Sequence, residues 1–137
     1  MLKQVQHDVF RGIINHATMY EIAIEDTFDA AHCLRGYEGA CSRLHGHTYR
    51  VRAAFRFASL EDSGLAFDFR KAKAVLRAVL EYLDHQYIND LPEFSVQNPS
   101  AEAIAKLIFD RVKESVPQTY CMSVWETPTA CAKYFEL

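Results

Sequence analysis

The chain has 137 residues, of which half are hydrophobic, and it carries a formal charge of −3. This length and composition are typical of one soluble globular domain with its own hydrophobic core, and they exclude an extended disordered chain. The negative charge argues against bulk electrostatic binding of nucleic acid or an anionic membrane, and no stretch approaches the ~18 apolar residues of a membrane-spanning helix.

The first half of the chain predicts two strands. Residues 1–18 show weak periodicity, so we expect a short helix or a loose arm there. From Tyr20 to Ala30, apolar and polar residues alternate, and this period of two predicts a half-buried strand. After a glycine-containing loop over 34–44, residues 49–57 alternate in the same way. The polar face is acidic on the first strand and basic on the second, so the two faces complement each other if the strands pair.

Two helices are expected next. Asp68 is a plausible N-cap, and apolar residues follow it at helical spacing from Phe69 to Leu83. A second helix is expected to begin near Ser100, because Asn98 or Ser100 can cap it and Pro99 suits a first turn.

Two further strands are expected over 120–127 and 131–135. The resulting order is strand, strand, helix, helix, strand, strand. It predicts a single α+β domain over 19–137, in which both helices pack on one face of a four-stranded antiparallel sheet.

Three histidines are expected to meet at one end of the first strand pair. His45 and His47 are two residues apart, so in an extended segment both side chains leave the same face, which they share with Tyr49. His32 has the parity of Phe28 on the inner face of the first strand. If the strands pair antiparallel without a bulge, His32 therefore faces His45 and His47.

Such a trio suits a zinc ion. Three neutral imidazoles are a common ligand set for Zn²⁺, and three protein ligands leave one position open for water or substrate. Gly46 lets the backbone come close between two of the ligands, and Cys33 should point to the opposite face from His32. The simpler alternative is that His45 and His47 are exposed in a turn.

Cys41 lies four residues before His45, in the loop expected to cover this site. A thiol beside Zn²⁺ and imidazoles can ionise readily and act as a base. It could equally be a fourth zinc ligand that closes the site, or an ordinary buried thiol, and the residues alone do not decide. We expect the four cysteines of the chain to be reduced and the protein to be cytoplasmic, because the chain is longer and more apolar than a disulfide scaffold.

Three other polar residues are candidates for the same site. Asp84 and His85 follow the first expected helix, and a carboxylate that orients a histidine is a common proton relay. Taken alone, the pair is better explained by the favourable position of a histidine near a helix C-terminus. Glu126 has the inward parity of Val124, so it either has a partner, such as an aminopyrimidine ring, or reaches solvent at the end of its strand.

Together these residues resemble the pyruvoyl-tetrahydropterin synthase family, in particular its bacterial 6-carboxy-tetrahydropterin synthase branch. The three-residue spacer between Cys41 and His45 is similar to that branch. The matching motifs are F-D-A-A-H (28–32), C-S-R-L-H-G-H (41–47), F-D-F (67–69), L-D-H (83–85), N-P-S-A-E (98–102) and W-E-T (125–127).

The resemblance implies a role for each candidate. It implies a T-fold, in which sheets from several subunits form a barrel with active sites between subunits. Cys41 would be the catalytic thiolate, and Glu126 would anchor a pterin. Ser100 would lie near the pterin, whereas Ala103 departs from the usual Asn of the family. The implied zinc ligands are His32, His45 and His47, and the implied relay, acting on the zinc of a neighbouring subunit, is Asp84 with His85.

The resemblance also implies a reaction. A zinc-dependent lyase would convert 7,8-dihydroneopterin triphosphate to 6-carboxy-5,6,7,8-tetrahydropterin, with release of acetaldehyde and triphosphate, in deazapurine (queuosine-type) biosynthesis. We expect a homo-oligomer, a hexamer or a tetramer, with a small-molecule substrate and no nucleic-acid or membrane partner. The alternatives are a pyruvoyl-forming synthase on the same scaffold and a non-catalytic zinc- or pterin-binding module. The residues that bind the triphosphate stay open among Arg43, Arg50 and Arg52.

Overall fold

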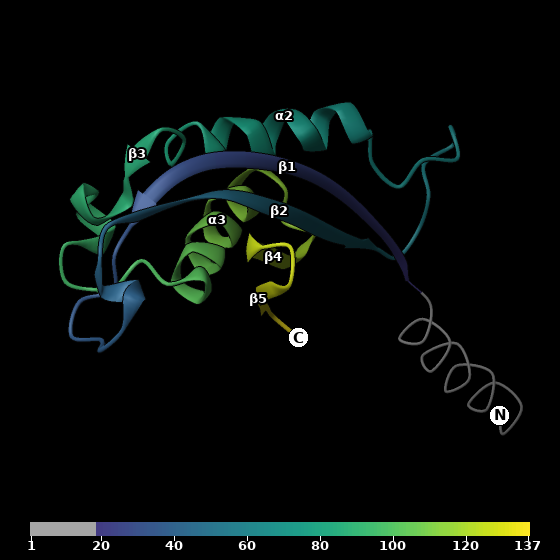
Figure 1. Cartoon of the computed structure of the whole chain (residues 1–137). Coiled ribbons are helices and arrows are strands. Elements are labelled where there is room, and N and C mark those ends of the chain that lie inside the picture. The colour runs from purple at the N-terminus through teal and green to yellow at the C-terminus, as the bar shows by residue number, and fades with distance from the viewer. Residues whose placement is uncertain (1–18) are drawn as a thin grey trace, which may run out of the picture.

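The computed structural model of the protein describes residues 19–137, and the expected N-terminal arm over 1–18 lies outside them. The described chain forms one curved sheet with two main helices (Figure 1). Along the sheet the strand order is β3-β1-β2-β4-β5, and all neighbours are antiparallel except β3 and β1. The strands are β1 (Tyr20–His32), β2 (His45–Phe57), β3 (Gln86–Tyr87), β4 (Thr119–Thr127) and β5 (Ala130–Phe135).

Both helices begin where the sequence predicts. Helix α2 spans Phe69–Leu80, and the side chain of Asp68 accepts a hydrogen bond from the backbone N–H of Arg70. Helix α3 spans Ala101–Ser115, with Ser100 as its N-cap. Figure 1 shows α2 lying along β1. Three short 3₁₀ turns complete the described chain: η1 (Ala40–Ser42), η2 (Ile88–Asp90) and η3 (Pro92–Phe94).

The α+β prediction is confirmed, with a difference in strand number. The sequence predicts four strands, and β3 adds a fifth of only two residues, which pairs in parallel with Ala30 and Ala31 of β1. Two residues are too few to produce an alternating pattern, so no sequence signal marks this strand. The first two strands are also longer than the alternation predicts, because β1 continues to His32 and β2 begins at His45. The candidate histidines therefore lie within these strands, near their ends.

One hydrophobic core joins the inner face of the sheet to both helices. Phe28 of β1 stacks on Tyr49 of β2 with ring centroids 4.7 Å apart. On the opposite face, the predicted charge complementarity is present, and Glu21 meets Arg56 at 3.1 Å. The core therefore lies on the face that also carries the histidines.

None of the helices within 19–137 is long and apolar enough to cross a membrane.

The packing of α2 on β1 generates a stability prediction. Leu76 of α2 is fully buried, so we expect Leu76→Ala to lower the free energy of unfolding by roughly 2–5 kcal/mol. Chemical denaturation at one fixed protein concentration measures the loss. The exposed Lys71 on the same helix gives the control Lys71→Ala, with an expected change within about 0.5 kcal/mol. Equal losses for the two variants would contradict this packing.

Candidate functional site

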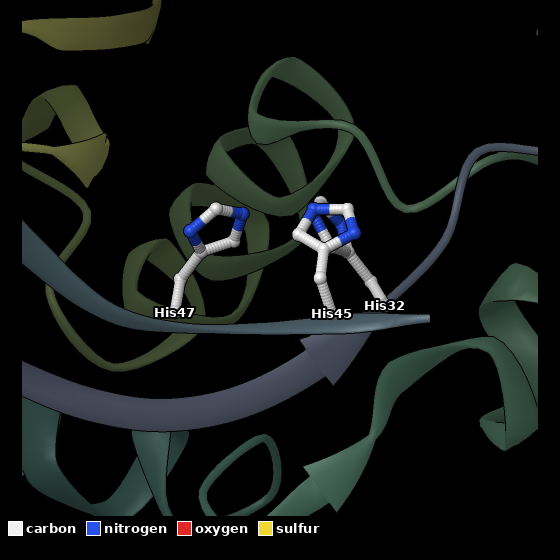
Figure 2. A group of neighbouring side chains, drawn as sticks. All are labelled: His32, His45 and His47. Atoms are coloured by element: carbon white, nitrogen blue, oxygen red, sulfur yellow. The ribbon is translucent and has the colours of Figure 1, made fainter. Parts of the chain in front are cut away.

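The structure brings His32, His45 and His47 together on the inner face, at the place that strand parity predicts (Figure 2). His32 ends β1 directly opposite His45, and His47 lies opposite Ala30. One ring nitrogen from each histidine lies within 4.8 Å of the other two, and the Nε2 atoms of His32 and His45 are 3.0 Å apart. These rings converge on one point from two neighbouring strands.

Backbone carbonyl groups orient two of the three rings. The Nδ1 atom of His32 lies 2.7 Å from the carbonyl oxygen of Pro99, and the Nδ1 atom of His45 lies 2.7 Å from that of Arg43. Because a carbonyl oxygen only accepts, each Nδ1 donates its proton, and each neutral ring is left with a lone pair on Nε2. When both rings are neutral, these two lone pairs lie 3.0 Å apart and cannot bond to each other, so the arrangement suits a cation placed between them.

His47 supplies a third free donor atom. Its Nε2 atom is buried and has no hydrogen-bond partner among the described residues. Burial lowers the pKa of His47, and the neighbouring rings of His32 and His45 lower it further, against the opposing effect of Glu126. A neutral imidazole is the form that binds a metal ion. The trio therefore fits a transition-metal ion held by three nitrogen atoms, with a coordination position left open.

Glu126 of β4 faces the trio. Its Oε1 atom lies 3.9 Å from Nε2 of His32, and its side chain is partly exposed. Tyr49 lies beneath the rings, and its buried hydroxyl has no hydrogen-bond partner among the described residues. Burial, followed by the negative charge of Glu126, raises the pKa of Tyr49. Sequence reasoning missed Tyr49 as a site residue, although a hydroxyl on the histidine face of β2 was a usable signal.

A small cavity of about 210 Å³ adjoins Glu126. Its wall includes Ser100, at the start of α3, and residues of the β4–β5 hairpin. The Oγ atom of Ser100 accepts a hydrogen bond from the backbone N–H of Ala103, so this side chain also caps the helix. Typical ligand pockets measure ~300–1,000 Å³, so this cavity is too small to enclose a large ligand unless another surface completes it.

Cys41 lies outside the group of metal-binding atoms. It is half-buried in η1, and its carbonyl oxygen accepts a hydrogen bond from Leu34 across the loop. The cluster whose donor atoms all lie within 4.8 Å contains the three histidines and no sulfur atom. The Sγ atom of Cys33 lies 3.2 Å from the hydroxyl of Tyr87 instead. This geometry favours an open trio over a site closed by a thiolate.

Asp84 and His85 form a second group, with Asp29, at the edge of β1. An Oδ1 atom of Asp84 accepts a hydrogen bond of 2.9 Å from the backbone N–H of Asp29 and lies 3.1 Å from Nδ1 of His85. The hydrogen bond from Asp29 lowers the pKa of Asp84, and His85 and Arg77 act in the same direction. Within one chain, this pair does not join the histidine trio.

Known proteins with a similar sequence or fold point to one family. Residues 21–136 match the family described as 6-pyruvoyl tetrahydropterin synthase. A 6-carboxy-5,6,7,8-tetrahydropterin synthase from Synechocystis is 39% identical over 123 residues, covering 85% of this chain and 94% of that protein. A second, from Bacillus subtilis, is 34% identical over 130 residues, covering 87% of each chain.

A solved structure shares the fold. The 6-pyruvoyl tetrahydropterin synthase of Caenorhabditis elegans superimposes with a TM-score of 0.79 at 23% identity, covering 88% of this chain and 97% of that chain. This likeness confirms the expected T-fold for the described sheet and helices.

The geometry of the trio predicts how the protein binds metal. We expect His47→Ala to lower the affinity for Zn²⁺ by at least about 100-fold, because a nitrogen donor is lost. His85→Ala removes an imidazole from outside the trio and should leave the affinity unchanged. Metal analysis and calorimetric titration of the two variants provide the measurement. Equal affinities would contradict metal binding by the trio.

Proposed function

The chain belongs to the 6-pyruvoyl tetrahydropterin synthase family, and from that premise we propose that it is a zinc-dependent lyase acting on 7,8-dihydroneopterin triphosphate. The proposed reaction consumes one molecule of water and gives 6-carboxy-5,6,7,8-tetrahydropterin, acetaldehyde and triphosphate, in a pathway to deazapurines. The curated relatives named for this activity support the choice of product. The observation that carries the proposal is the group of three converging imidazoles beside an inward-facing carboxylate.

The zinc ion would be held by His32, His45 and His47. When bound, it would supply Lewis-acid polarisation of oxygen atoms on the substrate side chain. The carbonyl contacts of His32 and His45 support this assignment, because they fix the rings with Nε2 free before any metal arrives.

Glu126 is proposed to recognise the pterin ring. A carboxylate can accept two parallel hydrogen bonds, and the aminopyrimidine edge of a pterin offers a ring N–H beside an amino group. The partly exposed side chain of Glu126 both borders the small cavity and approaches His32. A ring bound to Glu126 would therefore place its side chain near the histidine trio.

Two proton-transfer groups are proposed. Cys41 as a thiolate would remove a proton from the substrate side chain, and its loop position next to β2 supports this role. His85, oriented by Asp84, would transfer a second proton in the site of a neighbouring subunit. The separation of Asp84 and His85 from the trio within one chain supports a homo-oligomer, and so does the small size of the cavity.

Detection of acetaldehyde, the released two-carbon fragment, tests the proposed reaction. We expect the zinc-loaded enzyme to produce acetaldehyde from 7,8-dihydroneopterin triphosphate in proportion to the carboxylated pterin. A coupled alcohol dehydrogenase assay and mass spectrometry of the pterin measure the two products. Loss of triphosphate without acetaldehyde would instead indicate the pyruvoyl-forming reaction, and no turnover would indicate a binding module.

Cys41→Ala separates a catalytic thiolate from a zinc ligand. We expect the variant to keep its zinc and to lose about 10²–10⁴-fold in kcat, the usual contribution of a general base. Cys121→Ala makes the same chemical change at a buried position on β4 and should keep near-normal turnover. Loss of zinc from Cys41→Ala would show that the thiol is a ligand instead.

A further inference from the structure

Arg77 of α2 reaches the exposed edge of β1, where its guanidinium group meets several acceptors. Its Nη1 atom donates a hydrogen bond of 3.0 Å to the carbonyl oxygen of Thr27 and lies 3.4 Å from Asp26. The Nε and Nη2 atoms are shielded from solvent and make no hydrogen bond within the described residues, but they form ion pairs with Glu81 at 3.3 Å and with Asp84 at 3.5 Å. Among residues 19–137, no other arginine or lysine forms an ion pair with Asp84.

The edge of β1 explains why side chains gather there. Strand β3 covers β1 only at Ala30 and Ala31, so the backbone groups before them need other partners. The N–H of Asp29 donates to Asp84, the carbonyl oxygen of Asp29 accepts from the backbone N–H of His85 at 2.6 Å, and the carbonyl oxygen of Thr27 accepts from Arg77. One oxygen of the Asp84 carboxylate thus accepts a hydrogen bond from the β1 backbone, and the other lies 3.5 Å from the guanidinium group of Arg77.

We propose that Arg77 is a positioning residue for His85, acting through Asp84. The inference rests on the proposed function, which gives His85 the proton transfer. With Asp84 in place, its Oδ1 atom lies 3.1 Å from Nδ1 of His85 and favours the tautomer that carries the proton on Nδ1, so that the neutral ring presents a free lone pair on Nε2. The His85 side chain is 77% exposed, so this Nε2 atom is accessible to a ligand bound by another subunit.

The charges around Asp84 and His85 explain why the guanidinium group of Arg77 is needed. Asp29 faces the same group from β1, where its carboxylate accepts a hydrogen bond from the hydroxyl of Thr48 on β2. Two carboxylates, those of Asp29 and Asp84, therefore lie close together, and Arg77 from α2 balances them. Without the guanidinium, repulsion would push Asp84 away from its hydrogen bond with β1. His85 would then lose the acceptor that selects its tautomer.

The backbone conformation of His85 is a second reason why this residue depends on contacts with its neighbours. His85 has φ of 58°, in the left-handed region that non-glycine residues rarely adopt. Such a conformation persists only where surrounding contacts enforce it, and the hydrogen bond from its N–H to Asp29 is one of them. A small movement at Asp84 would consequently reach the ring through both its backbone and its Nδ1 atom.

The test uses Arg77→Gln in the full-length, zinc-loaded protein. Nitrogen-15 NMR of labelled histidines, with the His85 signal assigned by its absence in His85→Ala, measures how the neutral ring divides its proton between Nδ1 and Nε2. We expect the Nδ1–H population of His85 to fall, because an imidazole free in water favours Nε2–H. We also expect kcat to fall about 10-fold at nearly unchanged KM, the scale of effect caused by a displaced catalytic group.

Arg111→Gln is the matched control. Arg111 lies on α3, where it pairs with Glu93 and packs over the ring of Tyr82. Arg111→Gln removes an ion pair comparable to those of Arg77 and thereby weakens the packing of a helix, but it leaves the edge of β1 untouched. We expect normal His85 signals and normal kcat for this variant. Arg77→Lys keeps one charge but lacks the fork that reaches both Thr27 and Asp84, so its tautomer ratio and kcat should lie between those of Arg77→Gln and the parent.

One result would overturn the proposal: His85 signals in Arg77→Gln, or in Arg77→Lys if the glutamine variant does not fold, that match those of Arg111→Gln. The NMR measurement needs no substrate. A failure of the proposed lyase reaction, seen as a parent protein without turnover, is therefore distinguishable from a failure of Arg77 to position His85.

Discussion

The antiparallel pairing of β1 with β2 is the constraint on which the rest of the site depends. Its register sets His32 opposite His45 and, four residues further along the pair, Phe28 opposite Tyr49. Because side chains alternate across a strand, a slip of one residue would send one strand's histidines to the other face and would also expose its aromatic ring. The same alternation thus builds the core and gathers the nitrogen donors, so the histidine trio is as well specified as the hydrophobic packing beneath it.

The sequence predicted those parts of the site that depend on alternation and local capping. His32, His45 and His47 could be placed because parity along a strand is a local property, and the start of α3 could be placed from Ser100. The carbonyl contacts of the rings could not be foreseen, because the Pro99 oxygen that orients His32 comes from a segment far along the chain. Strand β3 and the ion pairs of the β1 edge likewise follow from tertiary packing and leave no periodic signal.

The acceptor at Nδ1 distinguishes two kinds of histidine in this fold. In the trio, the Nδ1 atoms of His32 and His45 each face a neutral carbonyl oxygen, which orients the ring and directs its Nε2 atom toward the other histidines. At the β1 edge, the acceptor beside Nδ1 of His85 is instead the carboxylate of Asp84. These two settings match the two proposed roles, metal binding by the trio and proton transfer by His85.

The loop between the two histidine-bearing strands is anchored to the rest of the domain near its base. Cys33 is tied to Asn89, and the backbone of Arg35 to Asn98, whereas the tip around the glycines is exposed. Lengthening a surface loop costs little free energy, since the closure entropy grows slowly with its length. A change in the length of this loop can therefore move Cys41, which the loop carries, with little effect on the three histidines that the strands below it hold in place.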